Sequence, residues 1–160
     1  MGNFNSSAPT PERRIDVDLT ADGGVKKRVV REGSGPFLQE GVYVQVHYTG
    51  ALENGIQFDS SRDRGLAFTF QVGSNQVVDG WNIAVKTMRV NERSIIEISP
   101  LYGYGDKRVG KIPPNSTLIF EIEVLRWYSG NPKLYSAFII GLVFFVCFIS
   151  LILTYFLIRK

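Results

Sequence analysis

The chain has 160 residues and a formal net charge of +3, from 18 basic and 15 acidic residues. Two of the basic residues, Arg159 and Lys160, end the chain, and the remainder is close to neutral. That remainder contains no basic stripe interleaved with aromatic residues, so the composition argues against a nucleic-acid partner. The single cysteine, Cys147, excludes an intramolecular disulfide and is compatible with a reducing compartment.

Residues 1–22 are polar, include Pro, Ser and Asn, and show no sustained apolar period. Such a composition is typical of a flexible tail, and we expect the folded domain to span residues 23–128. The first residues also lack the apolar stretch of a secretory signal peptide. We therefore expect this domain to face the cytosol.

Short strand-like runs separated by turn signals begin near residue 24. Val44, Val46 and Tyr48 alternate with polar residues, which is the period of a half-buried antiparallel strand. The sequence Glu-Asn-Gly at 53–55 predicts a hairpin turn, because Asn and Gly tolerate the positive φ that tight turns require. The first half of the domain is therefore predicted to be β-structure.

The same two-residue period recurs in three later runs, at residues 68–72, 93–99 and 117–125. Between the first and second of these, Trp81, Ala84 or Val85, and Met88 recur at helical spacing, with Asp79 as the expected N-cap. These patterns predict an α+β domain in which one short helix covers one sheet.

A long apolar run follows the domain. Residues 135–158 include 24 consecutive positions without a charge, enough for a helix that spans the hydrocarbon core of about 30 Å. Residues 129–134 form a short linker before it. We expect a single-pass tail anchor in the lipid bilayer of the endoplasmic reticulum, with another organelle as the alternative.

Common catalytic and metal-binding signatures are missing from the sequence. It contains no GxGxxG, GxxxxGK[ST], HExxH or CxxC pattern, and no GxSxG elbow for a Ser-His-Asp triad. The only histidine, His47, cannot supply the usual three or four ligands of a metal site, so we interpret it as structural or surface-exposed. We therefore expect neither a metal nor a cofactor.

Aromatic residues are concentrated near the expected turns. They either form the core of the domain or line an apolar concavity, and their placement at loop edges favours a pocket that accepts a proline ring. These residues are Tyr48, Phe58, Phe68, Phe70, Trp81, Tyr102, Tyr104 and Phe120.

The order and spacing of several motifs resemble the FKBP-type peptidyl-prolyl cis-trans isomerases from about Gly24 to Trp127. The motifs are HYTG, FDSSRDR, F-x-F-x-x-G, V-x-GW, YGYG and IPP-x-x-TL-x-F. The resemblance implies a strongly curved antiparallel sheet of five or six strands wrapped around one short helix. It also implies rotation of X-Pro bonds in proline-containing protein segments, and binding of the macrolides tacrolimus and rapamycin.

The resemblance also implies a set of site residues. Trp81 would form the pocket floor, the backbone N–H of Val78 and the hydroxyl of Tyr104 would bind carbonyl groups, and Arg64 would orient Asp59 and Tyr48 or act as a fold-stabilising ion pair. The catalytic set is Tyr48, Phe58, Asp59, Trp81, Tyr104 and Phe120. The set that binds substrate or inhibitor is Arg64, Phe68, Gln76, Val77, Val78 and Ile112.

Three features depart from the family pattern. The loop at 105–111 is one residue short, Lys111 replaces an apolar residue, and Gln76 stands where an acidic residue is frequent. We expect these changes to alter substrate preference rather than the pocket floor. The alternative function is a membrane-anchored binding or chaperone module that uses the same pocket without relying on catalysis.

Overall fold

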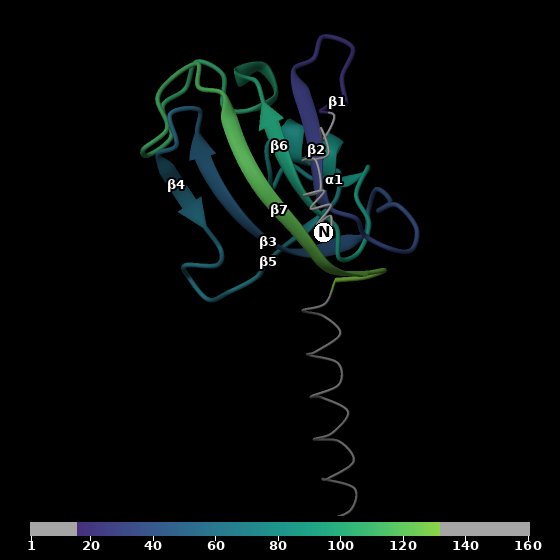
Figure 1. Ribbon diagram of the computed structural model, residues 1–160. Helices are drawn as coiled ribbons and strands as arrows, with labels where there is room; N and C mark the ends of the chain where they lie inside the picture. Colours follow the sequence, from purple (N-terminus) through teal and green to yellow (C-terminus); the bar gives the residue numbers. More distant parts are fainter. Residues whose placement is uncertain (1–15, 132–160) are drawn as a thin grey trace, which may run out of the picture.

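The computed structural model describes residues 16–131, which form one antiparallel sheet with a short helix packed on one face (Figure 1). The helix is α1 (Asp79–Val85), and a 3₁₀-helix, η1 (Pro100–Tyr102), follows later in the chain. The strands are β1 (Val17–Asp18), β2 (Val25–Arg31), β3 (Tyr43–Leu52), β4 (Gln57–Ser60), β5 (Phe68–Gln71), β6 (Arg93–Ile98) and β7 (Leu118–Tyr128).

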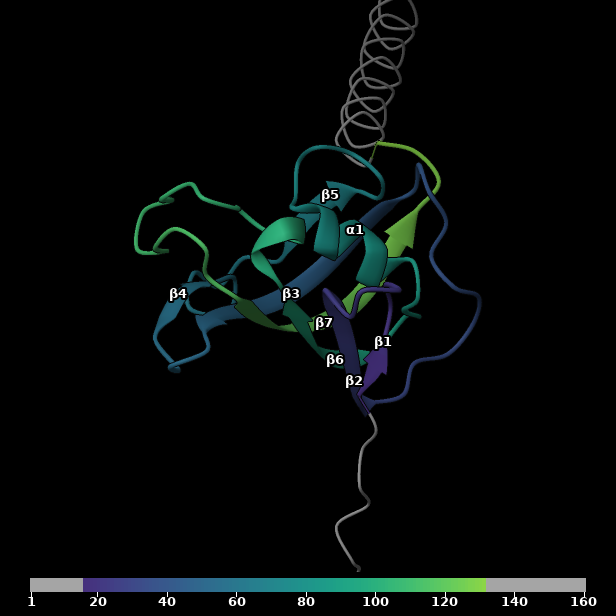
Figure 2. The same ribbon diagram turned by 90° about the horizontal axis from the view of Figure 1, so that it is seen from above.

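The strand order is β1-β2-β6-β7-β3-β4, and β5 also pairs with β3. The ten-residue β3 is the reason that both short strands fit: its first half pairs with β5 and its second half with β4. Figure 2 shows α1 on one side of the curved β3 and β7, as the wrapped-sheet prediction requires.

The described sheet has seven strands, so the prediction of five or six was too low. The additional strand is β1, whose Val17 pairs with Lys27 and whose Asp18 pairs with Lys26. Two exposed residues are too few to produce a recognisable period, and β1 lies inside the segment predicted as the tail, residues 1–22. The sheet thus begins before the predicted boundary at residue 23.

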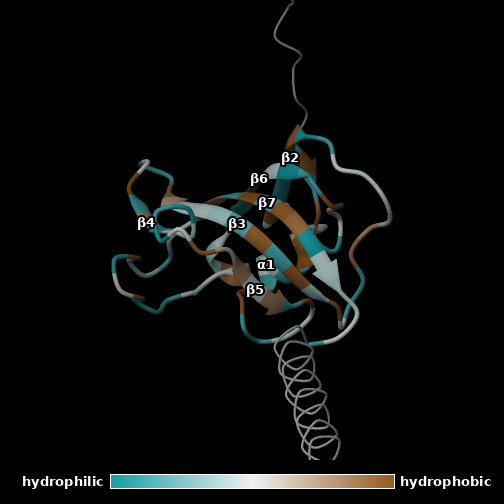
Figure 3. Cartoon of the chain, turned by 90° about the horizontal axis from the view of Figure 1, so that it is seen from below, coloured by the Kyte–Doolittle hydropathy of each residue, from teal (hydrophilic) through white to brown (hydrophobic). Residues whose placement is uncertain are grey.

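The predicted alternation along β3 is confirmed, since Val44, Val46 and Tyr48 are buried while their neighbours are partly exposed. Hydrophobic and hydrophilic residues alternate along β3 and β7 in Figure 3. The buried residues of β3, β6 and β7 form one core cluster with Trp81 and Met88, so the sheet places its apolar face against α1.

The helix begins one residue earlier than expected. The N-cap is Val78, whose carbonyl accepts a hydrogen bond from the Trp81 N–H at 3.0 Å, and Asp79 is the first helical residue. Asp79 was therefore wrongly predicted as the cap, although its carboxylate in the first turn still complements the helix dipole.

The four basic residues of β2 do not all face solvent. Lys26 and Arg28 are exposed, but Lys27 between them points inward and its side chain is only 10% exposed. Its ammonium donates to the Thr87 carbonyl at 2.8 Å and to the Glu92 carboxylate at 3.1 Å. The alternation of a strand requires this, because neighbouring residues face opposite sides.

Within residues 16–131, no helix is long and apolar enough to cross a membrane. The predicted membrane helix at 135–158 lies outside the described residues, as do residues 1–15 and the end of the predicted linker at 132–134. The strand β7 ends at Tyr128, immediately before that linker.

Candidate active site

A cavity of about 310 Å³ opens where β3, β4, β5, α1 and the loop between β6 and β7 converge. Every predicted site residue except Arg64 lines it. The lining residues are Tyr48, Phe58, Asp59, Phe68, Gln76, Val77, Val78, Trp81, Tyr104, Val109, Gly110, Lys111, Ile112 and Phe120. Val109, Gly110 and Lys111 were not among the predicted site residues, because they lie in an exposed loop without a regular pattern.

Trp81 forms the floor of this cavity and is 3% exposed. Its ring meets those of Tyr48 and Phe120 edge-on, with centroid distances of 5.0 and 5.2 Å and interplanar angles of 83° and 88°. Such T-shaped contacts are favourable and hold the rings in fixed orientations. The cavity thus has rigid aromatic walls.

Gly50 in β3 allows two of these walls to approach the strand. A Cβ atom at this position would lie 2.6 Å from the Phe58 ring and 2.7 Å from the Phe120 ring. Those two rings meet at a centroid distance of 5.5 Å. The missing side chain at Gly50 is therefore what brings Phe58 and Phe120 together on this side of the pocket.

Asp59, Tyr48 and Arg64 form a polar cluster at the edge of the apolar cavity. The Tyr48 hydroxyl donates to Asp59, and Arg64 donates both to Asp59 and, at 2.9 Å, to the Tyr48 hydroxyl. Both contacts predicted for Arg64 are therefore present, although Arg64 does not line the cavity. The arrangement fits an orienting role and a fold-stabilising ion pair equally well.

The charges in this cluster follow from its contacts. Burial by itself would raise the pKa of Asp59, but the hydrogen bonds from Tyr48 and Arg64 outweigh it and hold the pKa below its usual range. Burial, and then the bond to Asp59, raises the pKa of the Tyr48 hydroxyl. At neutral pH the cavity therefore contains an ionised carboxylate and a protonated phenol.

Two hydrogen-bond donors in the cavity wall have no partner within residues 16–131. The Tyr104 hydroxyl and the backbone N–H of Val78 make no hydrogen bond there. Burial, and then the charge of Asp59, raises the pKa of the Tyr104 hydroxyl, so it remains a donor at neutral pH. Both groups are available to the carbonyl oxygens of a bound ligand.

Gln76 also lines the cavity, but its side chain stabilises the loop that follows β5. The Gln76 Oε1 atom accepts hydrogen bonds from the Gln71 N–H at 2.9 Å and the Ser74 hydroxyl at 3.1 Å. The neighbouring Val77 and Val78 belong to the same wall of the cavity. Gln76 thereby fixes the segment that presents the Val78 N–H.

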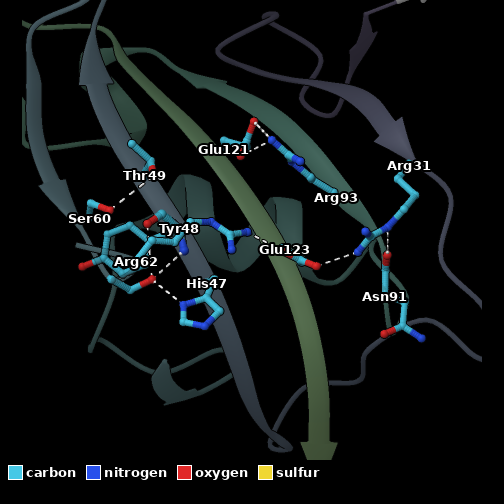
Figure 4. Close-up of polar contacts among 11 residues, drawn as sticks. Arg31, His47, Tyr48, Thr49, Ser60, Arg62, Asn91, Arg93, Glu121 and Glu123 are labelled. Atoms are coloured by element: carbon cyan, nitrogen blue, oxygen red, sulfur yellow. Dashed lines mark hydrogen bonds and ion pairs between the residues drawn. The ribbon is translucent and has the colours of Figure 1, made fainter. Parts of the chain in front are cut away.

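Side chains on the face of the sheet that points away from α1 hold the loop after β4 in place (Figure 4). Glu123 of β7 accepts hydrogen bonds from Arg62 in this loop and, at 2.6 Å, from Arg31 of β2. The bonds from Arg62 and Arg31 hold the pKa of Glu123 below its usual range, against the effect of burial. Because Asp59 lies just before this loop, the network limits the movement of the pocket carboxylate.

His47 lies on this same face, and its Nδ1 atom is 3.0 Å from the Ser61 hydroxyl (Figure 4). It is half-buried, in agreement with a structural role. In the part of the chain that the structure describes, no three His, Cys, Asp or Glu residues lie together in a way that could hold a metal ion.

Comparison with known proteins gives a consistent result. The sequence profile of FKBP-type peptidyl-prolyl cis-trans isomerases matches residues 35–125. The chain is 47% identical over 103 residues to FK506-binding protein 1 of Dictyostelium discoideum, covering 64% of this chain and 96% of that protein. It is 45% identical over 104 residues to a peptidyl-prolyl cis-trans isomerase of Schizosaccharomyces pombe, covering 64% and 93%.

A longer protein also matches. The chain is 43% identical over 129 residues to mouse peptidyl-prolyl cis-trans isomerase FKBP4, and the match covers 78% of this chain but 28% of FKBP4. The chain therefore spans little more than a quarter of that relative's length.

Proposed function

The chain belongs to the family of FKBP-type peptidyl-prolyl cis-trans isomerases, and we propose that its aromatic cavity catalyses rotation of X-Pro bonds in protein segments. The observation that carries the proposal is the combination of the buried Trp81 floor with two unpartnered donors, Tyr104 and Val78, in one cavity. A proline ring fits the apolar part, and carbonyls of neighbouring residues in the segment meet the donors.

The reaction needs no nucleophile, because it is rotation about a partial double bond with a barrier of about 18–20 kcal/mol. In a dry aromatic cavity the X-Pro carbonyl loses hydrogen bonds to water, which disfavours the planar, charge-separated amide. Trp81 and Phe120 hold the ring while Tyr104 and the Val78 N–H hold neighbouring carbonyls. Tighter binding of the twisted amide than of either planar form lowers the barrier.

We expect the roles of the other residues to follow from their positions. Phe58 and Phe68 complete the apolar wall, Val77 and Ile112 contact the ligand at its rim, and Gln76 acts through the loop that it holds. Asp59, oriented by Arg64 and Tyr48, presents a fixed negative charge beside the rotating bond. We also propose that tacrolimus and rapamycin bind in this cavity. The name of the Dictyostelium relative, FK506-binding protein 1, supports the first of these ligands.

The test is a measurement of cis-trans exchange in a short X-Pro peptide by NMR, with substoichiometric full-length chain in mild detergent. We expect faster exchange with the wild type and a large loss with Trp81→Leu, which removes the aromatic floor. Phe37→Leu, at an exposed aromatic that does not line the cavity, is the matched control and should retain the rate. Exchange at the solvent rate in the presence of folded wild type would contradict the proposal.

A binding or chaperone module is the second candidate, because the same cavity that holds a proline ring could act without turnover. It predicts that the chain binds the peptide and shifts its resonances while leaving the exchange rate unchanged. It also predicts that tacrolimus releases the bound peptide. The two candidates therefore differ in one measured quantity, the exchange rate at partial saturation.

We further propose that residues 135–158 anchor the domain to the membrane of the endoplasmic reticulum or another organelle. The domain would then lie on the cytosolic side of that membrane. The support is the run of 24 uncharged residues and the end of β7 at Tyr128. The six residues at 129–134 reach only about 20 Å when extended, so substrates would lie close to the bilayer.

Alkaline extraction of cell membranes tests the anchor. The wild type should stay in the pellet, and the pair Val146→Arg with Ile149→Arg should release the chain, since each charge at the centre of a span costs about 2.5–3.5 kcal/mol. The pair Val146→Leu with Ile149→Leu is the matched control. Extraction of the wild type with the soluble proteins would refute the anchor.

A further inference from the structure

The mouth of the cavity carries a concentration of unneutralised positive charge. Residues 105–112 contain Lys107, Arg108 and Lys111 but only one acidic residue, Asp106, so their net charge is +2. All four are exposed, and none forms an ion pair with any other residue in the range 16–131. This segment also supplies Val109, Gly110 and Lys111 to the cavity lining.

Basic residues elsewhere in the described domain are mostly neutralised. Arg64 is paired with Asp59 beside the cavity, Lys27 with Glu92, and Arg31 and Arg62 with Glu123. The exposed cations of the loop therefore differ from the general pattern of the domain. They create a local field for a ligand that enters the cavity, since the Asp59–Arg64 pair is itself neutral overall.

The loop holds Lys111 in a defined place. Val109 and Ile112 exchange backbone hydrogen bonds at 3.1 and 2.9 Å, which closes a tight turn with Gly110 and Lys111 at its tip. Gly110 has a φ of +54°, a conformation that favours glycine. Because Ile112 is buried in the cavity wall at 4% exposure, the turn fixes the adjacent Lys111 at the rim.

We propose that this rim selects X-Pro segments that carry an acidic side chain next to the proline, with Lys111 as the principal specificity-determining residue. The inference rests on the proposed isomerase function and narrows its substrate class. A proline ring on Trp81 places the flanking residues of the substrate at the mouth, where a carboxylate meets the ammonium of Lys111 and the field of Lys107 and Arg108. A basic flanking residue meets repulsion at the same place.

The size of the effect is set by solvent exposure. Exposed ion pairs contribute little each, so we expect kcat/KM for a Glu-containing peptide to exceed that of its Gln counterpart about two- to fivefold. The gain should appear mainly in KM, because the charge attracts the planar and the twisted substrate alike. It should shrink at high salt, where the Debye length falls to about 3 Å at 1 M.

The experiment uses the full-length chain in detergent and peptides that differ only by Glu, Gln or Lys, placed before the proline in one set and after it in another. Exchange is measured by NMR at low and high salt. In at least one set, kcat/KM should be highest for the Glu peptide, lower for the Gln peptide and lowest for the Lys peptide. The ratio of kcat/KM between the Glu and Gln peptides should fall for Lys111→Gln and fall below one for Lys111→Glu. Lys26→Gln removes the same charge from β2, and its Glu/Gln ratio should equal that of the wild type.

The outcomes separate the two proposals. No acceleration of any peptide contradicts the isomerase function itself. If the Gln peptides are accelerated but kcat/KM for the Glu peptide is no higher than for the Gln peptide in either set, the charge preference is overturned and the isomerase function stands. A Glu preference that Lys111→Glu leaves intact overturns the assignment to this rim, and Lys26→Gln lowering the ratio as much as Lys111→Gln would show an effect of net charge only.

Discussion

Replacing Gly50 with alanine should damage both the stability of the domain and the pocket, although it adds only one methyl group. Gly50 lies in the second half of β3, on the side of the strand that faces Phe58 and Phe120. The new Cβ atom would lie 2.6 and 2.7 Å from those two rings. Carbon atoms pack favourably at about 3.5–4.0 Å, so the rings must move by roughly 1 Å.

The magnitude follows from these distances. Overpacking of a well-packed core costs about 1–3 kcal/mol, and the lower entropy of the unfolded alanine chain returns about 0.4–1 kcal/mol. The net loss in the free energy of unfolding should be about 1–2 kcal/mol. For a domain of this size each kcal/mol corresponds to a drop of about 4–8 °C in Tm.

The activity should fall more steeply than the stability, because both displaced rings line the cavity. A misplacement of about 1 Å can cost about a hundredfold in rate, and we expect at least a tenfold loss of kcat/KM for Gly50→Ala. Thermal denaturation gives Tm, and NMR exchange of an X-Pro peptide well below that Tm gives kcat/KM.

The matched control is Gly130→Ala, because a Cβ atom there would meet no atom of residues 16–131 within 4 Å. The double variant with Gly50→Ala and Phe58→Leu should regain part of the stability, since the smaller side chain relieves one of the two contacts. A Gly50→Ala protein with the Tm and exchange rate of the wild type would refute the close packing of these rings on β3.

Three other perturbations test the ion pairs and donors described above. Glu92→Ala should lower the free energy of unfolding by about 3–5 kcal/mol in a urea titration, because it leaves the buried Lys27 ammonium without its ion pair. The control is Glu97→Ala, which removes the partner of the exposed Lys26. An equally small loss for both variants would contradict this prediction. Tyr104→Phe should reduce kcat/KM about three- to tenfold with an unchanged Tm, as expected for one lost hydrogen bond, and equal activity would exclude the hydroxyl from the reaction. Folding lowers the pKa of Asp59, so the stabilising effect of its carboxylate is complete above the ordinary aspartate pKa of about 3.9 and is lost as the pH falls through the lower folded value. The free energy of unfolding, measured across this pH range, should therefore decline less steeply in acid for Asp59→Asn than for the wild type. Identical profiles for the two proteins would disagree with the lowered pKa.

The sequence predicts local features of this fold better than long-range ones. The alternation of Val44, Val46 and Tyr48 determines which face of β3 is buried, because successive side chains of a strand point to opposite faces. The position of Trp81 on a helix follows in the same way from its spacing. The helix start was displaced by one residue because the carbonyl of Val78, which has no capping side chain, makes the first hydrogen bond.

Contacts between distant residues could not be predicted from periodicity. Lys27 and Glu92 are 65 positions apart, and Arg62 and Glu123 are 61 apart, so each pair depends on strand order and register. The pocket set came from the family motifs, since spacing alone cannot show that Tyr48 and Trp81 meet. The short β1 and the rim around Lys111 carry no periodic signal at all.

The most direct test of the proposed catalysis is a titration of tacrolimus against the X-Pro exchange rate catalysed by the full-length chain. Catalysis in the cavity floored by Trp81 predicts that the acceleration falls in proportion to the tacrolimus bound and reaches the solvent rate at one molecule per chain. Acceleration that persists when every cavity is occupied would contradict it, and so would a wild-type chain that binds tacrolimus but never accelerates exchange.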